Sequence, residues 1–196
     1  MVKVAIVYHS GKGHTAMQAQ SIKNGAESVE GVEVLYWNVE EAADKLDLLD
    51  GADAIVFGCP TYMGNVSAGM KAFQEHAVSR WSSRAWQDKI AGAFTTSTNL
   101  AGDKENTLMG LLTNAMQLGM IFVSLGIIPA ANEPESLHTA AGPSENAVNR
   151  TDTSLGAVAS AMLCEPEQMA KGDLETAYLY GQRIANITCQ FVRGRR

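Results

Sequence analysis

The sequence predicts an α/β protein in which a parallel sheet carries helices on both faces. Strand-like and helix-like segments alternate along the 196 residues, and the strand-like segments are apolar runs without polar alternation. Such runs are typical of parallel strands that are buried on both sides. Their alternation with helices indicates a doubly wound sheet, because parallel neighbours need a crossover connection. With no internal repeat or linker, we expect one domain over residues 1–196.

The expected strands end at turn-forming or polar residues. They span residues 2–8, 32–37, 54–59, 90–96 and 120–125. Helices are expected at residues 15–29, 42–49, 67–78, 105–118 and 173–192. Residues 126–156 are rich in Gly, Pro, Asn, Ser and Thr. We expect a long loop or insertion there, because the stretch exceeds an ordinary connection.

Composition excludes several classes of protein. A hydrophobic content of 46% with 18% charged residues indicates a globular chain. The net charge of −6 argues against nucleic-acid binding, and the basic cluster at residues 193–196 is interpreted as a solvated tail. Cys59, Cys164 and Cys189 have no CxxC spacing, so neither a disulfide framework nor a metal site is expected.

The chain also lacks the signals of secretion or membrane insertion. Its first residues run directly into a strand, without the apolar run and cleavage site of a signal peptide. No stretch approaches the roughly 18 to 20 apolar residues that a membrane span needs. We therefore expect a cytoplasmic protein without a membrane span.

Three loops follow the carboxyl ends of the first, third and fourth strands. Ligands of doubly wound sheets bind at this edge, where the strand order reverses. The loops comprise residues 9–15, 60–65 and 96–102, and all three have an unusual composition. Three such loops at one edge are stronger evidence for a ligand site there than any one of the loops alone.

The first loop, within YHSGKGHTAMQA at residues 8–19, has the glycines of a phosphate-binding turn. It is not a Walker A loop, because Lys12 precedes Gly13 and the spacing fails. Residues 11–16 do match the dinucleotide pattern G-x-G-x-x-A. That pattern also needs an acidic residue at the end of the second strand, where Asn38 and Glu40 are only nearby candidates.

A third interpretation of this loop uses its hydroxyls. Ser10 and Thr15 flank the glycines, so the turn offers two hydroxyl donors and the backbone N–H groups of a helix N-terminus. These neutral donors and the helix dipole suffice to hold a phosphate monoester. His9 is an alternative donor. The structural alternative is that Ser10 or Thr15 is an ordinary helix N-cap.

The other two loops suit an aromatic ring. In residues 60–65, a turn with Pro, Gly and Asn presents backbone amides, and Tyr62 and Met63 offer flat or polarizable surface. Residues 94–107 supply hydroxyls and an amide for the edge of a heteroaromatic ring. One loop for a phosphate and two for a ring favour flavin mononucleotide (FMN) over a nicotinamide dinucleotide.

On these motifs, the chain from Lys3 to Phe191 resembles the WrbA-type NAD(P)H:quinone oxidoreductases of the flavodoxin-like superfamily. The motifs are residues 10–15, FGCPTYMGN at 57–65, TTSTNLAG at 95–102 and LGMIFVSLG at 118–126. The resemblance implies a five-stranded flavodoxin-like sheet of order 2-1-3-4-5. It also implies bound FMN, NAD(P)H as electron donor, and a quinone or similar acceptor reduced by a ping-pong mechanism.

Because the chemistry belongs to FMN, no catalytic side chain is assigned. The expected cofactor-binding residues are Ser10, Gly11, Lys12, Gly13, His14, Thr15, Pro60, Thr61, Tyr62, Met63, Gly64, Asn65, Thr96, Ser97, Thr98, Asn99, Ala101 and Gly102. His138, in the long loop, is a candidate for protonating a product, although a solvated loop histidine is the simpler interpretation.

Three features bear on substrate and assembly. Trp81 matches a family tryptophan beside the flavin ring and nicotinamide, so substrate binding is expected there; otherwise it would be an ordinary aromatic. Gln117-Leu118 stand where the family has a histidine pair. The segment 37–53 is shorter than the family's, which carries an insertion linked to tetramer formation. A homodimer or homotetramer is expected.

Two alternatives stay open from the sequence. One is a flavodoxin-like electron carrier, or an FMN-bound regulatory protein, that turns over no small substrate. Carriers usually have a more acidic surface than a net charge of −6 gives, and residues 126–156 are long enough to roof a substrate pocket. The other is a dinucleotide-binding dehydrogenase, which would be colourless when purified. The acceptor and the choice between NADH and NADPH are also open.

Overall fold

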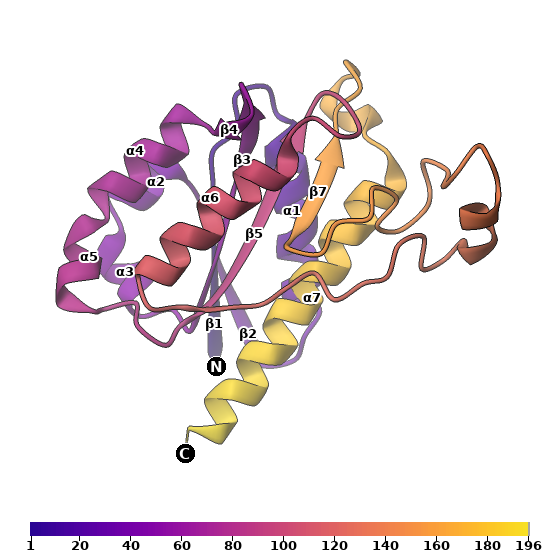
Figure 1. The fold of residues 1–196 in the computed structure, drawn as a ribbon. Coiled ribbons are helices and arrows are strands. Elements are labelled where there is room, and N and C mark those ends of the chain that lie inside the picture. The colour runs from indigo at the N-terminus through magenta and orange to yellow at the C-terminus, as the bar shows by residue number, and fades with distance from the viewer. Residues whose placement is uncertain (196) are drawn as a thin grey trace.

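A twisted parallel sheet lies between two layers of helices in the computed structural model, which describes residues 1–195 (Figure 1). Arg196, the last residue of the expected basic tail, lies outside the described residues. The long strands are β1 (Val2–Tyr8), β2 (Val32–Asn38), β3 (Ala54–Tyr62) and β5 (Ile90–Ser97). They confirm the first four strands that the apolar runs predict.

The order of the sheet is also the expected one. Strand β1 pairs in parallel with β2 on one side and with β3 on the other, and β5 then pairs in parallel with β3. Every residue of β3 except the last is buried, as the unbroken run AIVFGC suggests. The result is the flavodoxin-like order, in which the carboxyl ends of β1, β3 and β5 lie side by side at one edge.

The fifth position of the sheet differs from the prediction. Instead of one strand over 120–125, β6 (Ile121–Phe122) pairs with the start of β5, and β7 (Ala157–Ser160) pairs with its end. The chain leaves the sheet after β6 and returns as β7, so residues 126–156 are an insertion within a strand position. Together with the short β4 (Asn65–Val66), which folds back on the end of β3, this gives a seven-stranded sheet rather than a five-stranded one.

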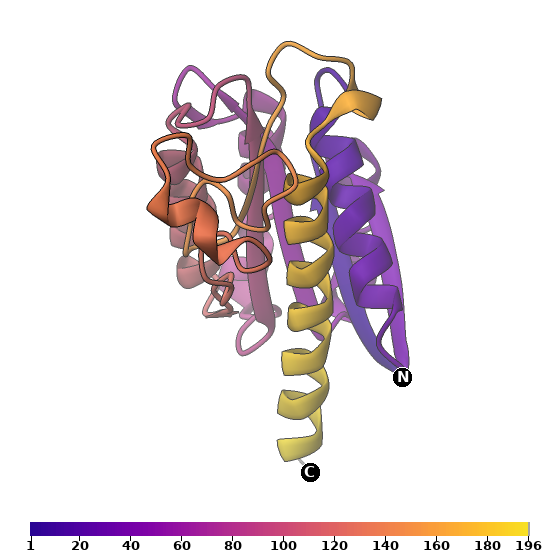
Figure 2. The same cartoon turned by 90° about the vertical axis from the view of Figure 1, so that its right-hand side faces the viewer.

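Helices cover both faces of the sheet, as expected (Figure 2). Helices α1 (His14–Glu27) and α7 (Lys171–Gly194) lie side by side on one face, around a core that includes Ile22 and Tyr180. The opposite core, around Phe57 and Trp86, is covered by α2 (Val39–Ala43), α3 (Leu46–Asp50), α4 (Ala68–His76), α5 (Val78–Ser83) and α6 (Lys104–Gln117).

Two predicted helices are each divided in the structure. The helix expected at 42–49 is α2 followed by α3, because Asn38 and Glu41 form a capping box that starts α2 early and the backbone breaks at Lys45. The helix expected at 67–78 is α4 followed by α5, which continues to Ser83. Helix α5 ends where Arg84 takes a left-handed conformation, with φ of 57°.

The basic end of the chain is not a free tail over its described part. Arg193 and Gly194 belong to α7. The guanidinium of Arg195 donates to the carbonyl oxygen of Asp88 and lies over the ring of Phe191. The helix therefore extends beyond the predicted end at residue 192, because its arginine has partners on the protein.

The insertion at 126–156 projects beside α7 and has internal order (Figures 1 and 2). It contains a short 3₁₀ helix, η1 (Pro134–His138), and a second one, η2 (Pro166–Gln168), follows β7. At its neck, Asn149 Nδ2 donates to the carbonyl oxygens of Ile127 and Thr153. The insertion is thus closed at its base by one buried side chain.

Across residues 1–195, no helix combines the length and the apolar character that crossing a membrane requires.

Candidate functional site

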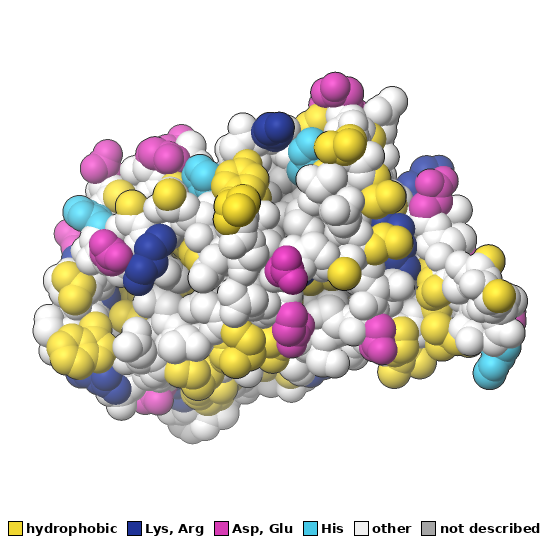
Figure 3. Space-filling view, turned by 45° about the horizontal axis from the view of Figure 1, so that its top comes forward, with side chains coloured by type: hydrophobic (Ala, Val, Ile, Leu, Met, Phe, Trp, Pro, Cys, Tyr) yellow, Lys and Arg dark blue, Asp and Glu magenta, His cyan; other side chains and the backbone are white. Residues whose placement is uncertain are grey.

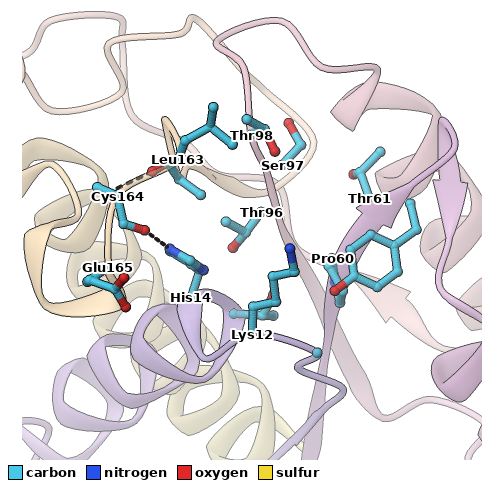
Figure 4. A pocket seen from close by; sticks show the side chains of 14 residues that line it. Lys12, His14, Pro60, Thr61, Thr96, Ser97, Thr98, Leu163, Cys164 and Glu165 are labelled. Carbon is cyan, nitrogen blue, oxygen red and sulfur yellow. Dashed lines mark hydrogen bonds between the residues drawn. The ribbon is translucent and has the colours of Figure 1, made fainter.

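A cavity of about 310 Å³ lies at the carboxyl edge of the sheet, where the three unusual loops meet (Figure 4). Its volume is at the lower end of the range of about 300 to 1,000 Å³ that ligand pockets occupy. The lining combines hydroxyls, backbone and a few apolar groups. The lining residues are Gly11, Lys12, His14, Thr15, Pro60, Thr61, Tyr62, Thr96, Ser97, Thr98, Ala161, Leu163, Cys164 and Glu165. We call this space the main cavity.

One wall of the main cavity is the N-terminus of α1. Gly13 has φ of 91°, a conformation that favours glycine, and it turns the chain from β1 into the helix. The first N–H groups of a helix have no acceptor within the helix, and they carry a partial positive charge. Thr15 is buried at this wall, and Lys12 extends along the cavity in Figure 4. This wall is suited to an anionic group.

Ser10 lies beside the main cavity rather than on its surface. Its Oγ accepts hydrogen bonds from the N–H groups of Gly13 and Ala16, both at 3.2 Å. It lines a separate shallow hollow that also contains Tyr8, His9, Gly13, Ala16, Asn38 and Glu40. In this conformation Ser10 stabilises the loop and the first turn of α1, but the N-cap of the helix is Gly13 rather than Ser10 or Thr15.

His9 also lies away from the main cavity. Its Nδ1 is 2.9 Å from Ser67 Oγ, and its ring packs against Gly69 at the start of α4. His138 belongs to η1 in the projecting insertion. Neither histidine lines the main cavity, so the geometry favours the structural interpretation of both.

The end of β3 and the turn that follows it form a second wall. Thr61 is buried, and its Oγ1 is hydrogen-bonded to Thr95 Oγ1 at 2.9 Å and to Thr107 Oγ1 at 2.8 Å. Tyr62 leans over the first loop so closely that a side chain at Gly11 would collide with its hydroxyl. Its neighbour Met63 is fully exposed, with φ of 49°. Thr61 therefore anchors this loop, and Tyr62 and Met63 are presented at the surface.

The remaining residues of that loop shape it rather than line the cavity. Asn65 Oδ1 accepts the N–H of Val66 in β4, and Asn106 Nδ2 donates to the carbonyl oxygen of Gly64. These bonds tie the turn to itself and to α6. Gly64 and Asn65 thus lie one turn away from the main cavity.

The end of β5 forms the third wall. Thr96 Oγ1 donates to Gln18 Oε1 of α1 at 2.8 Å, and Ser97 Oγ donates to the carbonyl oxygen of Asn99 at 3.2 Å. Thr96, Ser97 and Thr98 line the cavity, whereas Asn99, Ala101 and Gly102, in the loop that follows, do not line it.

A fourth wall was missed by the sequence analysis. Residues 161–165 follow β7 and contribute Ala161, Leu163, Cys164 and Glu165 to the lining. His14 Nε2 donates to the carbonyl oxygen of Cys164 at 2.7 Å, which ties this segment to α1 (Figure 4). The four residues before this segment, AVAS at 157–160, are the strand β7, which the sequence analysis did not predict. Without that strand, nothing indicated that residues 161–165 lie at the carboxyl edge of the sheet.

Exposed apolar side chains lie on the loops around the main cavity, and two of them, Tyr62 and Leu163, line it. Figure 3 looks toward this edge and shows hydrophobic side chains among polar and charged ones. The exposed apolar residues of the surrounding loops are Tyr62, Met63, Leu100, Met162 and Leu163, of which Leu163 is 88% exposed. We call this set the apolar rim. Large exposed apolar groups gathered at a cavity indicate a binding surface.

Trp81 lies elsewhere, on α5. It is 54% exposed and lines a second hollow between α4 and α6, together with Gln117 and Leu118. Trp81 therefore lies beside Gln117 and Leu118, the position at which the family has a histidine pair. Within this one chain they are not part of the main cavity.

Two ionisable groups near the main cavity have shifted pKa values. Burial raises the pKa of the Cys59 thiol, which precedes Pro60 at the end of β3, so this cysteine stays protonated. Burial also lowers the pKa of the Lys104 ammonium to about 8, opposed by the nearby carboxylate of Asp173. Lys104 lies behind the loop that follows β5.

Comparison with known proteins shows which proteins this chain resembles in sequence. The sequence signature of the NADPH-dependent FMN reductases matches residues 36–135. The chain is 42% identical over 189 residues to Flavodoxin FldP of Pseudomonas aeruginosa, covering 95% of this chain and 97% of that protein. It is 38% identical over 142 residues to the Quinone-oxidoreductase QR2 of Triphysaria versicolor, covering 63% and 69% of the two chains.

Solved structures agree with this assignment. The flavodoxin, WrbA-like protein from Agrobacterium tumefaciens superposes with a TM-score of 0.72 at 34% identity, over 97% of this chain and 99% of that one. Membership of such a family implies that the chain binds a flavin, and the hydroxyls and helix N-terminus of the main cavity fit the phosphate of FMN. The chain belongs to the NADPH-dependent FMN reductase family, as a WrbA-type protein of the flavodoxin-like superfamily.

Proposed function

We propose that the main cavity binds FMN and that the protein transfers two electrons from NAD(P)H to a quinone or a similar acceptor. The observation that carries this proposal is the arrangement of the walls. A helix N-terminus forms one wall, and the exposed apolar side chains of Tyr62 and Leu163 lie on the other walls. Such a cavity suits a ligand with a phosphate at one end and a flat ring at the other.

The phosphate belongs at the first turn of α1. Thr15 offers a hydroxyl, Lys12 a positive charge and His14 an imidazole, next to the orphan N–H groups of the helix. Ser10 completes this set if its hydroxyl turns from the backbone toward the phosphate. Gly11 and Gly13 let the backbone approach the phosphate closely.

The ring belongs between the loops after β3 and β5. In this proposal residues 60–63 flank the ring, with Tyr62 and Met63 nearest to it, and Thr96, Ser97 and Thr98 bind its polar edge. Bound FMN supplies the two-electron chemistry, and the protein supplies orientation and electrostatics. No side chain needs to act as an acid or a base in hydride transfer, which agrees with the lack of a catalytic assignment.

The apolar rim supports a flat organic acceptor. Donor and acceptor rings cannot occupy the same surface together, so they must bind in turn, and the rate law should be ping-pong. Relatives named NAD(P)H dehydrogenase (quinone), such as the Methanosarcina barkeri protein at 33% identity over 151 residues, support the choice of substrates.

A second candidate function is electron carriage without turnover of a small substrate. It is favoured by the 42% identical relative, which is named a flavodoxin and matches almost the whole chain. The two functions differ in their response to NAD(P)H. A carrier would be reduced slowly by it and would take up electrons one at a time.

Assembly into a homodimer or homotetramer is part of the proposal. Trp81 and Gln117 share a hollow outside the main cavity, so Trp81 contacts the substrate only if a second copy brings it there. We further propose that residues 1–196 form one folding unit. All three cysteines are free, which accords with a reducing cytoplasmic compartment.

The test begins with the absorption spectrum of the purified protein, which should show bound flavin. Steady-state kinetics with NADH and with NADPH against benzoquinone should then give parallel double-reciprocal lines. A chain that purifies without flavin and binds none would refute the FMN site. Flavin that neither nicotinamide bleaches within minutes, in the absence of oxygen, would refute the enzyme and leave the carrier.

A further inference from the structure

Lys104 is a buried lysine directly behind the main cavity. It begins α6, and only 3% of its surface is exposed. Its Nζ donates to three consecutive carbonyl oxygens of the preceding loop, those of Asn99 at 2.5 Å, Leu100 at 2.8 Å and Ala101 at 3.4 Å. The ammonium is therefore the group around which this loop is folded.

This loop is the continuation of a cavity wall. Ser97 and Thr98 line the cavity, and the three carbonyls that follow turn away from it toward Lys104. Successive carbonyls of an extended chain alternate in direction, so three of them reach one donor only in a tight turn. Gly102 and Asp103 complete that turn with φ of 56° and 54°.

The ammonium has no carboxylate committed to it among the described residues. Asp173 faces it from α7, but that carboxylate is held by Arg150 at 2.8 and 2.9 Å and by the N–H of Ser160 at 2.9 Å. Asp103, Glu105 and Asp152 line the hollow on the outer side of the lysine. Keeping this charge buried is unfavourable, as its lowered pKa indicates.

We propose that Lys104 is a positioning residue of the cofactor site: by binding the carbonyls of residues 99–101, it holds Ser97 and Thr98 against the cavity. The inference rests on the proposed function only in naming FMN as the ligand. A role in binding is expected because the loop that Lys104 holds continues directly from Ser97 and Thr98, which line the cavity.

The chain contains a matched control at the opposite end of β5. The Nζ of Lys89 also donates to backbone carbonyls, those of Asp50 at 2.7 Å and Ala52 at 2.5 Å, and burial also lowers its pKa. Lys89 lies immediately before β5, at the amino end of the strand. The variants Lys104→Met and Lys89→Met therefore remove the same chemistry from two ends of one strand.

Three measurements compare these variants with the wild type at about pH 7. Hydrogen exchange in FMN-free protein should be about tenfold faster in Lys104→Met at the N–H groups of Ala161 and Met162, which donate to the carbonyl oxygens of Ser97 and Thr98 at 2.8 Å, because those two residues lose their support. The dissociation constant of FMN should rise by about tenfold. The urea midpoint should not fall, because the variant no longer buries a charge. Lys89→Met should leave both the loop and FMN binding unchanged.

A pH series adds a test that does not depend on a loop mutation. Raising the pH from about 7 to about 9 removes the ammonium proton, so FMN binding by the wild type and by Lys89→Met should weaken by up to about tenfold. Binding by Lys104→Met should stay flat. If Lys104→Met does not fold, the variant Lys104→Gln is used in its place.

Unchanged exchange at the N–H groups of Ala161 and Met162, or an equal pH dependence in all variants, would overturn the proposal. So would a loss of FMN affinity that the urea midpoint follows in proportion, because that pattern describes a merely structural lysine. If the wild type binds no FMN, the proposed function fails, and the exchange measurement on FMN-free protein still decides the role of Lys104.

Discussion

The two ends of the parallel sheet are held by different kinds of contact. At the amino end, Asp50 Oδ1 accepts from the indole N–H of the buried Trp86 at 2.7 Å, and both carboxylate oxygens of Asp50 accept from Arg80. Lys89 binds two carbonyls beside this group. Four side chains thus connect α3, α5 and the start of β5 into one closed network.

At the carboxyl end the polar groups face an open cavity, and the backbone there is less favourable. Met63, Met162 and Leu163 are exposed apolar residues with φ of 49°, 47° and 60°, in the left-handed region that such residues rarely adopt. At the amino end the residues other than glycine with positive φ are polar, namely Arg84 and Asp88. Unfavourable backbone of this kind concentrates at functional sites, so the comparison assigns stability to one end and binding to the other.

The largest expected effect is on binding at the carboxyl end. The double variant Ser10→Ala and Thr15→Ala should weaken FMN binding by about two orders of magnitude or more, since each hydroxyl donates a charge-assisted bond worth roughly 1.5 to 3 kcal/mol. The fold should persist, with about 1 kcal/mol lost because the N–H groups of Gly13 and Ala16 lose the Ser10 hydroxyl as their acceptor. Fluorescence titration of FMN measures the change.

The single variants sharpen this prediction. Thr15 lines the main cavity, whereas Ser10 lies beside it and binds backbone N–H groups. The control is Thr113→Ala, whose hydroxyl binds only the carbonyl of Met109 on the exposed face of α6. Flavin occupancy that survives in the double variant would move the phosphate site away from this loop.

The next effect is on stability at the amino end. Asp50→Ala leaves the N–H of Trp86 buried without its partner and frees Arg80, so the free energy of unfolding should fall by about 2 to 3 kcal/mol. FMN affinity should not change, because the network is far from the cavity. Urea unfolding and FMN titration of the same sample measure both quantities.

Asp47→Ala is the matched control for this change. Asp47 also pairs with Arg80, but its side chain is almost fully exposed, so its loss should cost little. If Asp50→Ala weakened FMN binding as strongly as it weakened the fold, the separation between the two ends would be wrong.

A smaller effect concerns pH. The pKa of Lys104 is about 8 in the folded chain and 10.5 as its ordinary value, so the unfolded chain binds more protons between about pH 8 and pH 10.5. Within that window Lys104 should make stability rise with pH, by at most about 1.4 kcal/mol per pH unit. Below the window its buried charge is a constant cost.

The difference between wild type and Lys104→Met isolates this contribution. Tyr36 and Tyr180, whose pKa values burial raises, and Lys89 are present in both proteins and cancel. Urea unfolding from about pH 7 to about pH 10 gives the difference. Lys71→Met, at an exposed lysine paired with Glu75, is the control and should show no such slope. A flat difference would mean that Lys104 is not desolvated.

The sequence predicted the fold well where local patterns and tertiary structure agree. The apolar runs of β1, β3 and β5 placed these strands within a residue or two, except that β3 runs on to Tyr62, because strands buried on both faces have no polar interruptions. The prediction of a single strand at the fifth position of the sheet was wrong for a physical reason. Two short pieces, β6 and β7, complete it from either side of the insertion, and pairing across such a distance leaves no local signal.

The candidate site shows the same division. Thr15, Tyr62 and Ser97 lie on loops that follow predicted strands, so the edge rule brought them together correctly. Leu163 and Cys164 were missed because they follow β7. The sequence also could not predict whether a loop residue faces the cavity. Hydrogen bonds within the loop decide this, as at Ser10 and Asn99.

The smallest expected effect tests whether the rim touches the ring. Tyr62 is 45% exposed and leans over Gly11, so its ring covers one side of the proposed flavin position. Tyr62→Ala should alter the fluorescence and the reduction potential of bound FMN, because an aromatic neighbour is replaced by water. The affinity should fall by no more than about tenfold, since aromatic contacts contribute about 0.5 to 1.5 kcal/mol. Tyr62→Phe, which keeps the ring and removes only the hydroxyl, should stay close to the wild type. A spectrum and a potential unchanged by Tyr62→Ala would place this residue outside the cofactor contacts, and the carboxyl end would then bind the flavin through its hydroxyls and backbone alone.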